Sequence, residues 1–188
     1  MSRAFAVVRT LVVGTVFLSI WFYWLPLWFA HIEGVSLAPH HPWAWTVFAV
    51  GAALSSWCAM EFALRGEGTP APFDPPRRLV ITGLYRWVRN PMYLGMALML
   101  VGEAILLSQI WREMAALSVV LATAVAVMVI KKEEPDLQRQ FGAEFEEYCR
   151  LVPRWVPRLE PLAAEDHPAV RRRTVQPSGR GPSARPEG

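Results

Sequence analysis

The stretch GLYRWVRNPMYLG, residues 83–95, joins a basic and aromatic segment directly to an uncharged run, and the predicted fold follows from this junction. Arg86 and Arg89 stand just before Asn90 and Pro91. Asparagine is favoured immediately before a first helical turn and proline fits the first helical position, so a helix is predicted to begin here. An apolar helix that begins beside arginines is typical of a membrane span.

Other parts of the chain carry the same kind of run. Stretches with little or no charge cover residues 10–30, 42–60, 90–110 and 114–130. Each approaches the roughly 20 residues that an α-helix needs to cross the core of a bilayer. With 53% hydrophobic and 19% charged residues, the sequence predicts an all-α, polytopic membrane helical bundle with about four transmembrane helices. Pro26, inside the first run, predicts a kink near its far end.

Positive charge marks one side of the predicted membrane. Arginines or lysines precede the first run, lie between the second and third, and follow the fourth at Lys131 and Lys132, whereas the opposite side offers Arg112 alone. By the positive-inside rule, both termini and the middle loop are predicted to be cytoplasmic. The net charge of +3 is therefore a topology signal, and the expected partners are membrane lipids rather than nucleic acid. The cysteines and loop histidines lack metal-ligand spacing, so no metal is expected.

The chain after the fourth run predicts an amphipathic helix. Pro135 suits a first helical turn, and Leu137, Phe141, Phe145 and Tyr148 form one apolar stripe with charges opposite. This helix is predicted to lie at the membrane interface or to pack under the bundle. The expected organisation is an N-terminal helix pair over 1–64, a core over 65–158 and a disordered tail over 159–188.

Two charged features near the predicted cytoplasmic face admit a structural and a functional interpretation. The arginines beside the helix start at Asn90 form a collar or, with free N–H groups, an anion site. Glu133 and Glu134 are either first-turn acids of the next helix or carboxylates for ribose hydroxyls or an ammonium group. Together the two features fit a zwitterionic, nucleotide-like ligand. Glu103, inside the third run, has either a structural partner or a role on the substrate side.

GLYRWVRNPMYLG, a helical hairpin and then EEPDLQRQFGAEFEEYCRLVPRWVP together resemble the isoprenylcysteine carboxyl methyltransferase and phospholipid methyltransferase superfamily of integral membrane enzymes, over about residues 66–157. The resemblance implies methyl transfer from S-adenosylmethionine to a lipophilic acceptor at the cytoplasmic face. It implies catalytic roles for Arg89 and Glu134. The residues that it assigns to cofactor binding are Arg77, Leu79, Val80, Tyr85, Asn90, Pro91, Met92, Tyr93 and Glu133.

The chain departs from the isoprenylcysteine branch at two positions. Asn90 stands where that branch has histidine, and Val129 stands where it has an arginine, with Lys131 and Lys132 nearby as substitutes. The acceptor group therefore stays open between an isoprenylcysteine-type carboxylate, a thiol and a lipid amine. The alternatives are a membrane reductase of the steroid or enoyl type that uses NADPH, and a small membrane scaffold without enzymatic activity.

Overall fold

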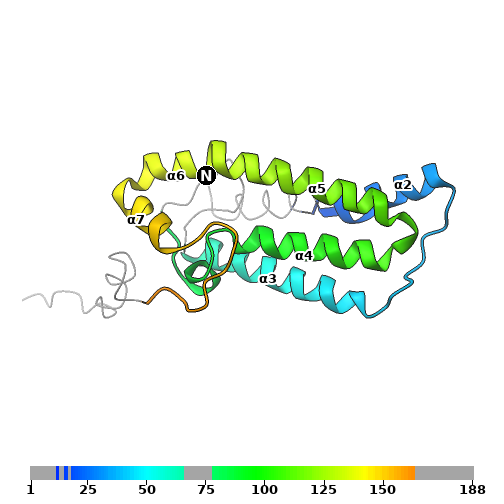
Figure 1. The fold of residues 1–188 in the computed structure, drawn as a ribbon, viewed down its shortest axis with the longest axis horizontal. Helices are drawn as coiled ribbons and strands as arrows, with labels where there is room; N and C mark the ends of the chain where they lie inside the picture. The colour runs from blue at the N-terminus through cyan, green and yellow to red at the C-terminus, as the bar shows by residue number, and fades with distance from the viewer. Residues whose placement is uncertain (1–11, 13–14, 17, 66–77, 164–188) are drawn as a thin grey trace, which may run out of the picture.

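The apolar runs form long helices that lie side by side (Figure 1). The computed structural model describes residues 12, 15–16, 18–65 and 78–163, and within them every regular element is helical. Arg77 of the predicted cofactor segment and residues 164–188 of the predicted tail lie outside this part. The elements are η1 (Ile20–Trp24), α2 (Leu25–Glu33), α3 (Ala44–Arg65), η2 (Gly83–Arg86), α4 (Pro91–Leu106), η3 (Ser108–Ile110), α5 (Trp111–Met128), η4 (Val129–Glu133), α6 (Glu134–Phe141) and α7 (Ala143–Leu151).

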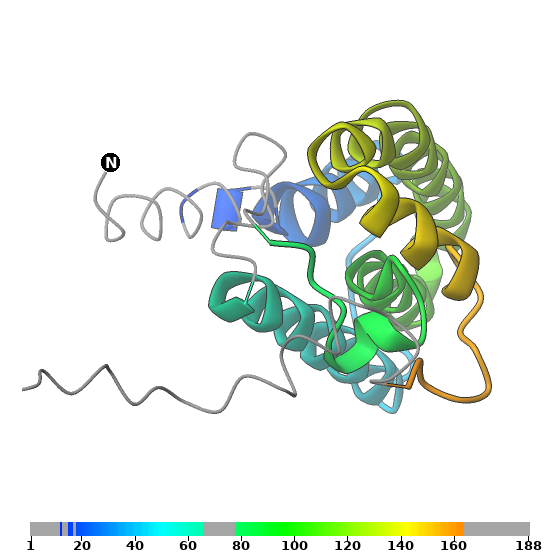
Figure 2. The same cartoon turned by 90° about the vertical axis from the view of Figure 1, so that its left-hand side faces the viewer.

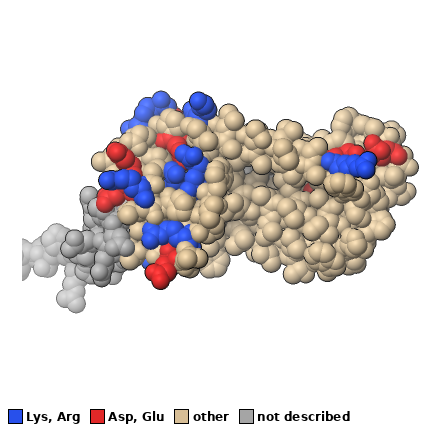
Figure 3. All heavy atoms as spheres, in the orientation of Figure 1, with Lys and Arg blue, Asp and Glu red and all other residues tan. Residues whose placement is uncertain are grey.

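The longest helix has the length and composition of a membrane span. In the described part of the chain, the continuous helix Ser108–Phe141, of 34 residues, is the one that is long and apolar enough to cross a bilayer, and Pro91–Leu106 is a shorter apolar helix. Figure 3 shows charged side chains at the two ends of the molecule and an uncharged belt between them on the visible face. This distribution indicates membrane association. The count of four spans stays a prediction.

Helices α3 and α4 pack closely because glycines stand where they touch. A Cβ added to Gly51 would lie 2.6 Å from the carbonyl oxygen of Gly95, and one added to Gly95 would lie 2.5 Å from Ser55 Oγ. The two backbones therefore approach more closely than larger residues would allow, as small residues permit in membrane helix pairs. Ser55 Oγ also donates to the carbonyl oxygen of Met92 at 3.2 Å. Figure 2 shows these two helices beside each other, with α5 next to α4.

Helix α6 begins at Glu134, beside Pro135 as the sequence predicts, but it continues α5 without a break. The continuity comes through η4, a π-helical turn in which the Glu134 N–H donates to the carbonyl oxygen of Val129. In a regular α-helix a proline ring clashes with the carbonyl four residues earlier, and the wider turn before Pro135 relieves that contact. The same arrangement recurs where a kink was predicted, since π-helical η1 ends two residues before Pro26.

The predicted C-terminal amphipathic helix is two helices rather than one. Gly142 separates α6 from α7 with φ 55° and ψ −127°, a conformation that favours glycine. The apolar stripe nevertheless packs into a single cluster, which contains Leu79, Ile81, Leu137, Phe141, Phe145, Tyr148, Val152 and Leu162. Protein therefore covers the apolar face, as in the alternative of packing under the bundle. Leu162, which the sequence placed in the tail, is 1% exposed.

Candidate active site

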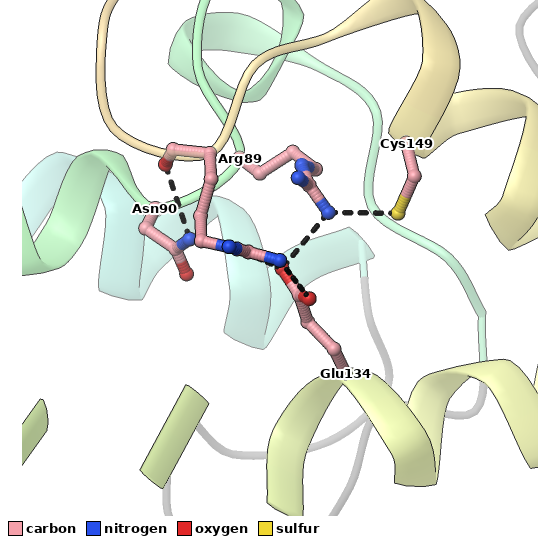
Figure 4. A network of polar contacts seen from close by, with 5 residues as sticks. Arg89, Asn90, Glu134 and Cys149 are labelled. Atoms are coloured by element: carbon pink, nitrogen blue, oxygen red, sulfur yellow. Dashed lines mark hydrogen bonds and ion pairs between the residues drawn. The ribbon is translucent and has the colours of Figure 1, made fainter. Parts of the chain in front are cut away.

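A polar network joins the start of α4 to Glu134 and to α7 (Figure 4). Arg89 Nη1 donates to Glu134 Oε1 and contacts Cys149 Sγ, each at 2.8 Å. Arg154 donates through Nε and Nη2 to both carboxylate oxygens of Glu134, at 2.8 and 2.7 Å. The Arg89 and Glu134 side chains are only 12% and 17% exposed. Two guanidinium groups thus share one carboxylate in a partly buried place, where charge-assisted hydrogen bonds are strong.

Asn90 takes the predicted position before α4, but its side chain does not cap the helix. Instead, Asn90 Nδ2 donates to the carbonyl oxygen of Arg154 at 3.1 Å. The backbone of Asn90, with φ −121° and ψ 53°, lies outside the usual extended cap conformation. Pro91 is buried at the first helical position, as the sequence predicted. The amide of Asn90 therefore fastens the C-terminal segment to the helix start.

The chain after α7 lies along the stretch that precedes α4. The Arg89 N–H donates to the carbonyl oxygen of Pro153 at 2.9 Å, and the Arg158 N–H donates to that of Trp87 at 2.9 Å. Further along, the Leu162 N–H donates to the carbonyl oxygen of Arg86 at 3.0 Å. The two sequence motifs that carry the family resemblance are thus in direct contact through their backbones.

Glu133 meets α4 through a tyrosine. Tyr93 Oη, in the first turn of α4, donates to Glu133 Oε1 at 2.5 Å. Glu133 is the last residue of the π-helical turn, so the position of its carboxylate depends on that turn. Neighbouring acids in the sequence therefore face different partners: Glu133 faces a hydroxyl group, and Glu134 faces two arginines.

Tyr85 lies at the centre of an apolar cluster between α3 and α4. Cys58, Val80 and Tyr85 are buried together, with Met92 packed against them. Tyr148 Oη donates to the Tyr85 carbonyl oxygen at 2.7 Å. Burial, together with the negative charge that Cys58, Glu133 and Glu61 can carry, raises the pKa of Tyr85 above its usual range. The Tyr85 hydroxyl is therefore a neutral group at physiological pH.

The segment before Tyr85 sends alternate side chains to two places. Val80 joins the Tyr85 cluster, whereas Leu79 and Ile81 pack against the cluster under α7. Alternation of this kind is expected of an extended chain. Among the described residues of the predicted cofactor set, Leu79 alone packs against the cluster under α7.

Two residues of the polar network were missed by sequence reasoning. Neither Arg154 nor Cys149 is among the site residues that the sequence predicts. An arginine between the prolines of VPRWVP was the available signal, since a charge held in a turn near an acidic pair can form a bridge. No comparable signal in the sequence points to Cys149.

Three other residues that the sequence singled out lie outside the polar network. Val129 is 1% exposed and packs inside the protein, whereas Lys131 is exposed. Glu103 is 5% exposed, and its Oε2 atom has no hydrogen-bond partner. It lies ten residues beyond Tyr93, about 15 Å along an α-helix. Among the described residues, no three His, Cys, Asp or Glu side chains come together to hold a metal ion.

This chain is similar to a known protein and to a known family. NccN, a nickel-cobalt-cadmium resistance protein of Alcaligenes xylosoxydans xylosoxydans, is 32% identical to this chain over 112 residues, which are 58% of this chain and 46% of NccN. The chain therefore covers less than half the length of that relative. No solved structure matches this chain. The family model for phospholipid methyltransferases matches residues 39–144, more than half of the chain. The match includes α3, α4, η4 and both acids, and the chain belongs to the phospholipid methyltransferase family.

Proposed function

We propose that this protein is a membrane methyltransferase that uses S-adenosylmethionine and methylates a lipophilic acceptor at the cytoplasmic face. Membership of a methyltransferase family supports the reaction class. The observation that carries the proposal is the hydrogen bond between Tyr93 and Glu133, beside the Arg89–Glu134–Arg154 network. Acidic, phenolic and guanidinium groups are gathered at one end of an apolar bundle, as a zwitterionic ligand requires.

The side chains present match the chemistry of S-adenosylmethionine. Glu133 supplies a carboxylate for an ammonium group or for ribose hydroxyls, and Tyr93 supplies a phenol beside it. Arg89 Nε is buried and lacks a hydrogen-bond partner, so it can receive an anionic group. Val80, Tyr85 and Met92 offer an apolar surface to an adenine ring. Asn90 and Pro91 set the helix start on which these groups depend.

When bound, S-adenosylmethionine supplies an activated methyl group, so the protein has to orient the reactants and exclude water. We assign the exclusion of water to the C-terminal segment, which covers the helix start through Pro153 and Arg158. Glu134 acts in positioning, because its two oxygens already accept three hydrogen bonds from Arg89 and Arg154.

The acceptor is expected to reach the site from the membrane. The exposed faces of α3 and α5 are apolar, with Trp45, Trp57, Val119 and Val127 among their exposed side chains. Val129 is buried where the isoprenylcysteine branch has an arginine, so no cation from that position meets a substrate carboxylate. This favours a lipid amine or thiol over an isoprenylcysteine carboxylate. The family match does not favour the NADPH reductase or the scaffold.

Calorimetry on detergent-purified protein tests the cofactor. We expect saturable binding of S-adenosylmethionine and no binding of NADPH. Tyr93→Phe removes the phenol hydroxyl and Glu133→Gln removes the negative charge of the carboxylate, and each should raise the Kd about tenfold. Glu146→Gln is the matched control, because Glu146 is an exposed acid on α7. Undiminished affinity in both site variants would contradict the assignment of this site.

A second experiment addresses the reaction. Membranes that contain the protein are incubated with cofactor labelled in its methyl group, and the lipid extract is separated and counted. We expect label in an extractable lipid, lost in Glu133→Gln and retained in Glu146→Gln. Label in no extractable compound, despite cofactor binding, would contradict the lipophilic acceptor.

A further inference from the structure

A hydrogen bond ties the connector before α4 to the end of α3. Thr82 Oγ1 donates to Glu61 Oε2 at 2.6 Å, across 21 residues of sequence. Thr82 stands just before the 3-10 turn η2, and its side chain makes no bond within that turn. Its hydroxyl is thus used to hold the connector against α3. Glu61 lies one turn beyond Cys58, which packs on Tyr85.

The backbone on both sides of this bond fits the same close contact. Gly83 has φ 55°, and a Cβ at this position would lie 3.4 Å from both Glu61 Cδ and Trp57 Nε1. Glycine therefore allows a left-handed turn directly beside α3. The Tyr85 N–H donates to the Thr82 carbonyl oxygen at 3.0 Å, and Tyr148 Oη donates to the Tyr85 carbonyl oxygen at 2.7 Å. Tyr85 is thus held from one side by Thr82 and from the other by α7.

We propose that Glu61 is a positioning residue of the methyltransferase site, which fixes Tyr85 by accepting the hydroxyl hydrogen of Thr82. The inference rests on the proposed function, since it gives Tyr85 a place in the cofactor site. Glu61 acts through Thr82 and η2, and what the Thr82 hydroxyl needs from it is an acceptor atom. A glutamine, which keeps a carbonyl oxygen at the same reach, should therefore preserve the effect.

The first test measures the connector itself, without cofactor. Amide hydrogen exchange is followed by mass spectrometry on the full-length protein in detergent, for peptides that cover residues 82–88. Thr82→Val and Glu61→Met should speed exchange there at least threefold, because the η2 amides lose their fixed neighbour. Thr82→Ser and Glu61→Gln should exchange as the wild type does. Unchanged exchange in both disruptive variants would overturn the inference that the hydrogen bond between Thr82 and Glu61 holds the connector.

The second test measures the Kd of S-adenosylmethionine in the same variants, with Ser56→Ala, at an exposed position of α3, as a control. Thr82→Val and Glu61→Met should each raise the Kd about three- to tenfold, and the double variant should raise it no further. In a Tyr85→Ala background, Thr82→Val should add nothing. An additive loss in that background would overturn positioning through Tyr85, because a general structural defect would persist there.

The two tests separate failure of this inference from failure of the proposed function. If the wild type binds no S-adenosylmethionine while exchange responds as expected, the proposed function fails, and with it the role of Glu61 in cofactor binding. If the wild type binds the cofactor but the disruptive variants bind it equally well, the proposed function stands and the inference fails. If Glu61→Gln raised the Kd of S-adenosylmethionine as much as Glu61→Met does, the role of Glu61 as hydrogen-bond acceptor would also be overturned.

Discussion

Removing Glu134 should destabilise this protein more than removing Arg154, although both belong to the same ion pair. Arg89 and Arg154 face a single carboxylate, and Arg89 is only 12% exposed. Glu134→Gln leaves two guanidinium groups facing each other without a counter-charge. Arg154→Met leaves Glu134 with Arg89 as its partner. The asymmetry follows from having two cations for one anion.

The magnitudes follow from burial. Breaking a buried pair by removing one partner costs about 3–5 kcal/mol. Glu134 is 17% exposed, so Glu134→Gln should lower the free energy of unfolding by about 3 kcal/mol, the low end of that range. Arg154 is 34% exposed and its loss strands no charge, so Arg154→Met should cost about 1–2 kcal/mol. Arg139→Met is the control. Arg139 is 76% exposed and pairs with Asp136, which should be worth under about 0.5 kcal/mol.

Unfolding is followed by tryptophan fluorescence during titration of detergent-solubilised protein with sodium dodecyl sulfate. The three variants and the wild type are compared at one pH and one salt concentration, since salt screens exposed pairs more than buried ones. We expect the losses to rank Glu134→Gln, Arg154→Met, Arg139→Met. A larger loss for Arg154→Met than for Glu134→Gln would refute the reasoning, because it would mean that the second arginine is held by contacts other than this carboxylate.

Three other outcomes can be checked with the same preparation. Gly51→Val should lower the free energy of unfolding by more than about 2 kcal/mol, since a Cβ there meets backbone at 2.6 Å, whereas Ala53→Val at an exposed position of α3 should have little effect. Gly142→Ala should cost about 1–3 kcal/mol in the same titration, from the positive φ alone, because nothing lies within 4 Å of the added Cβ. Burial raises the pKa of the Cys149 thiol even though Arg89 lowers it. In a Cys58→Ser background, alkylation of Cys149 at pH 8.5 should therefore be slower than that of a small peptide thiol, and should speed up as pH rises further.

The positions of the helices were predictable from the sequence, whereas the continuity of α5 with α6 and the break between α6 and α7 were not. Apolar runs and the pair Asn90–Pro91 place α3 and α4 within a few residues of their observed bounds. Pro135 after KKEE favoured a new helix, because proline ordinarily interrupts one. A π-helical turn gives a second solution, but its extra residue has no side-chain signature. The break at Gly142 was equally hidden, since the apolar stripe continues through it with helical spacing.

Some residues of the candidate site were predictable from the sequence, whereas the hydrogen bonds that join them to the C-terminal segment were not. Tyr93 and Glu133 follow from the family resemblance, and the structure joins them at 2.5 Å. The bridge from Arg154 to Glu134 depends on how the chain returns after α7. The side chain of Asn90 could form the cap that its position predicts or bond to another backbone carbonyl. Only the presence of the Arg154 carbonyl decides between these partners.

The π-helical turn η4 constrains the length of this chain as well as its shape. Each residue added to or removed from a helix turns everything beyond it by about 100°. A deletion elsewhere in α5 would turn Glu133 and Glu134 away from α4 in this way, whereas a deletion within 129–133 would close the π turn and bring the Pro135 ring back onto the backbone carbonyl before it. Insertions and deletions among relatives should therefore avoid this interval. An engineer who replaces α5 with a foreign membrane span must carry the extra residue across with it.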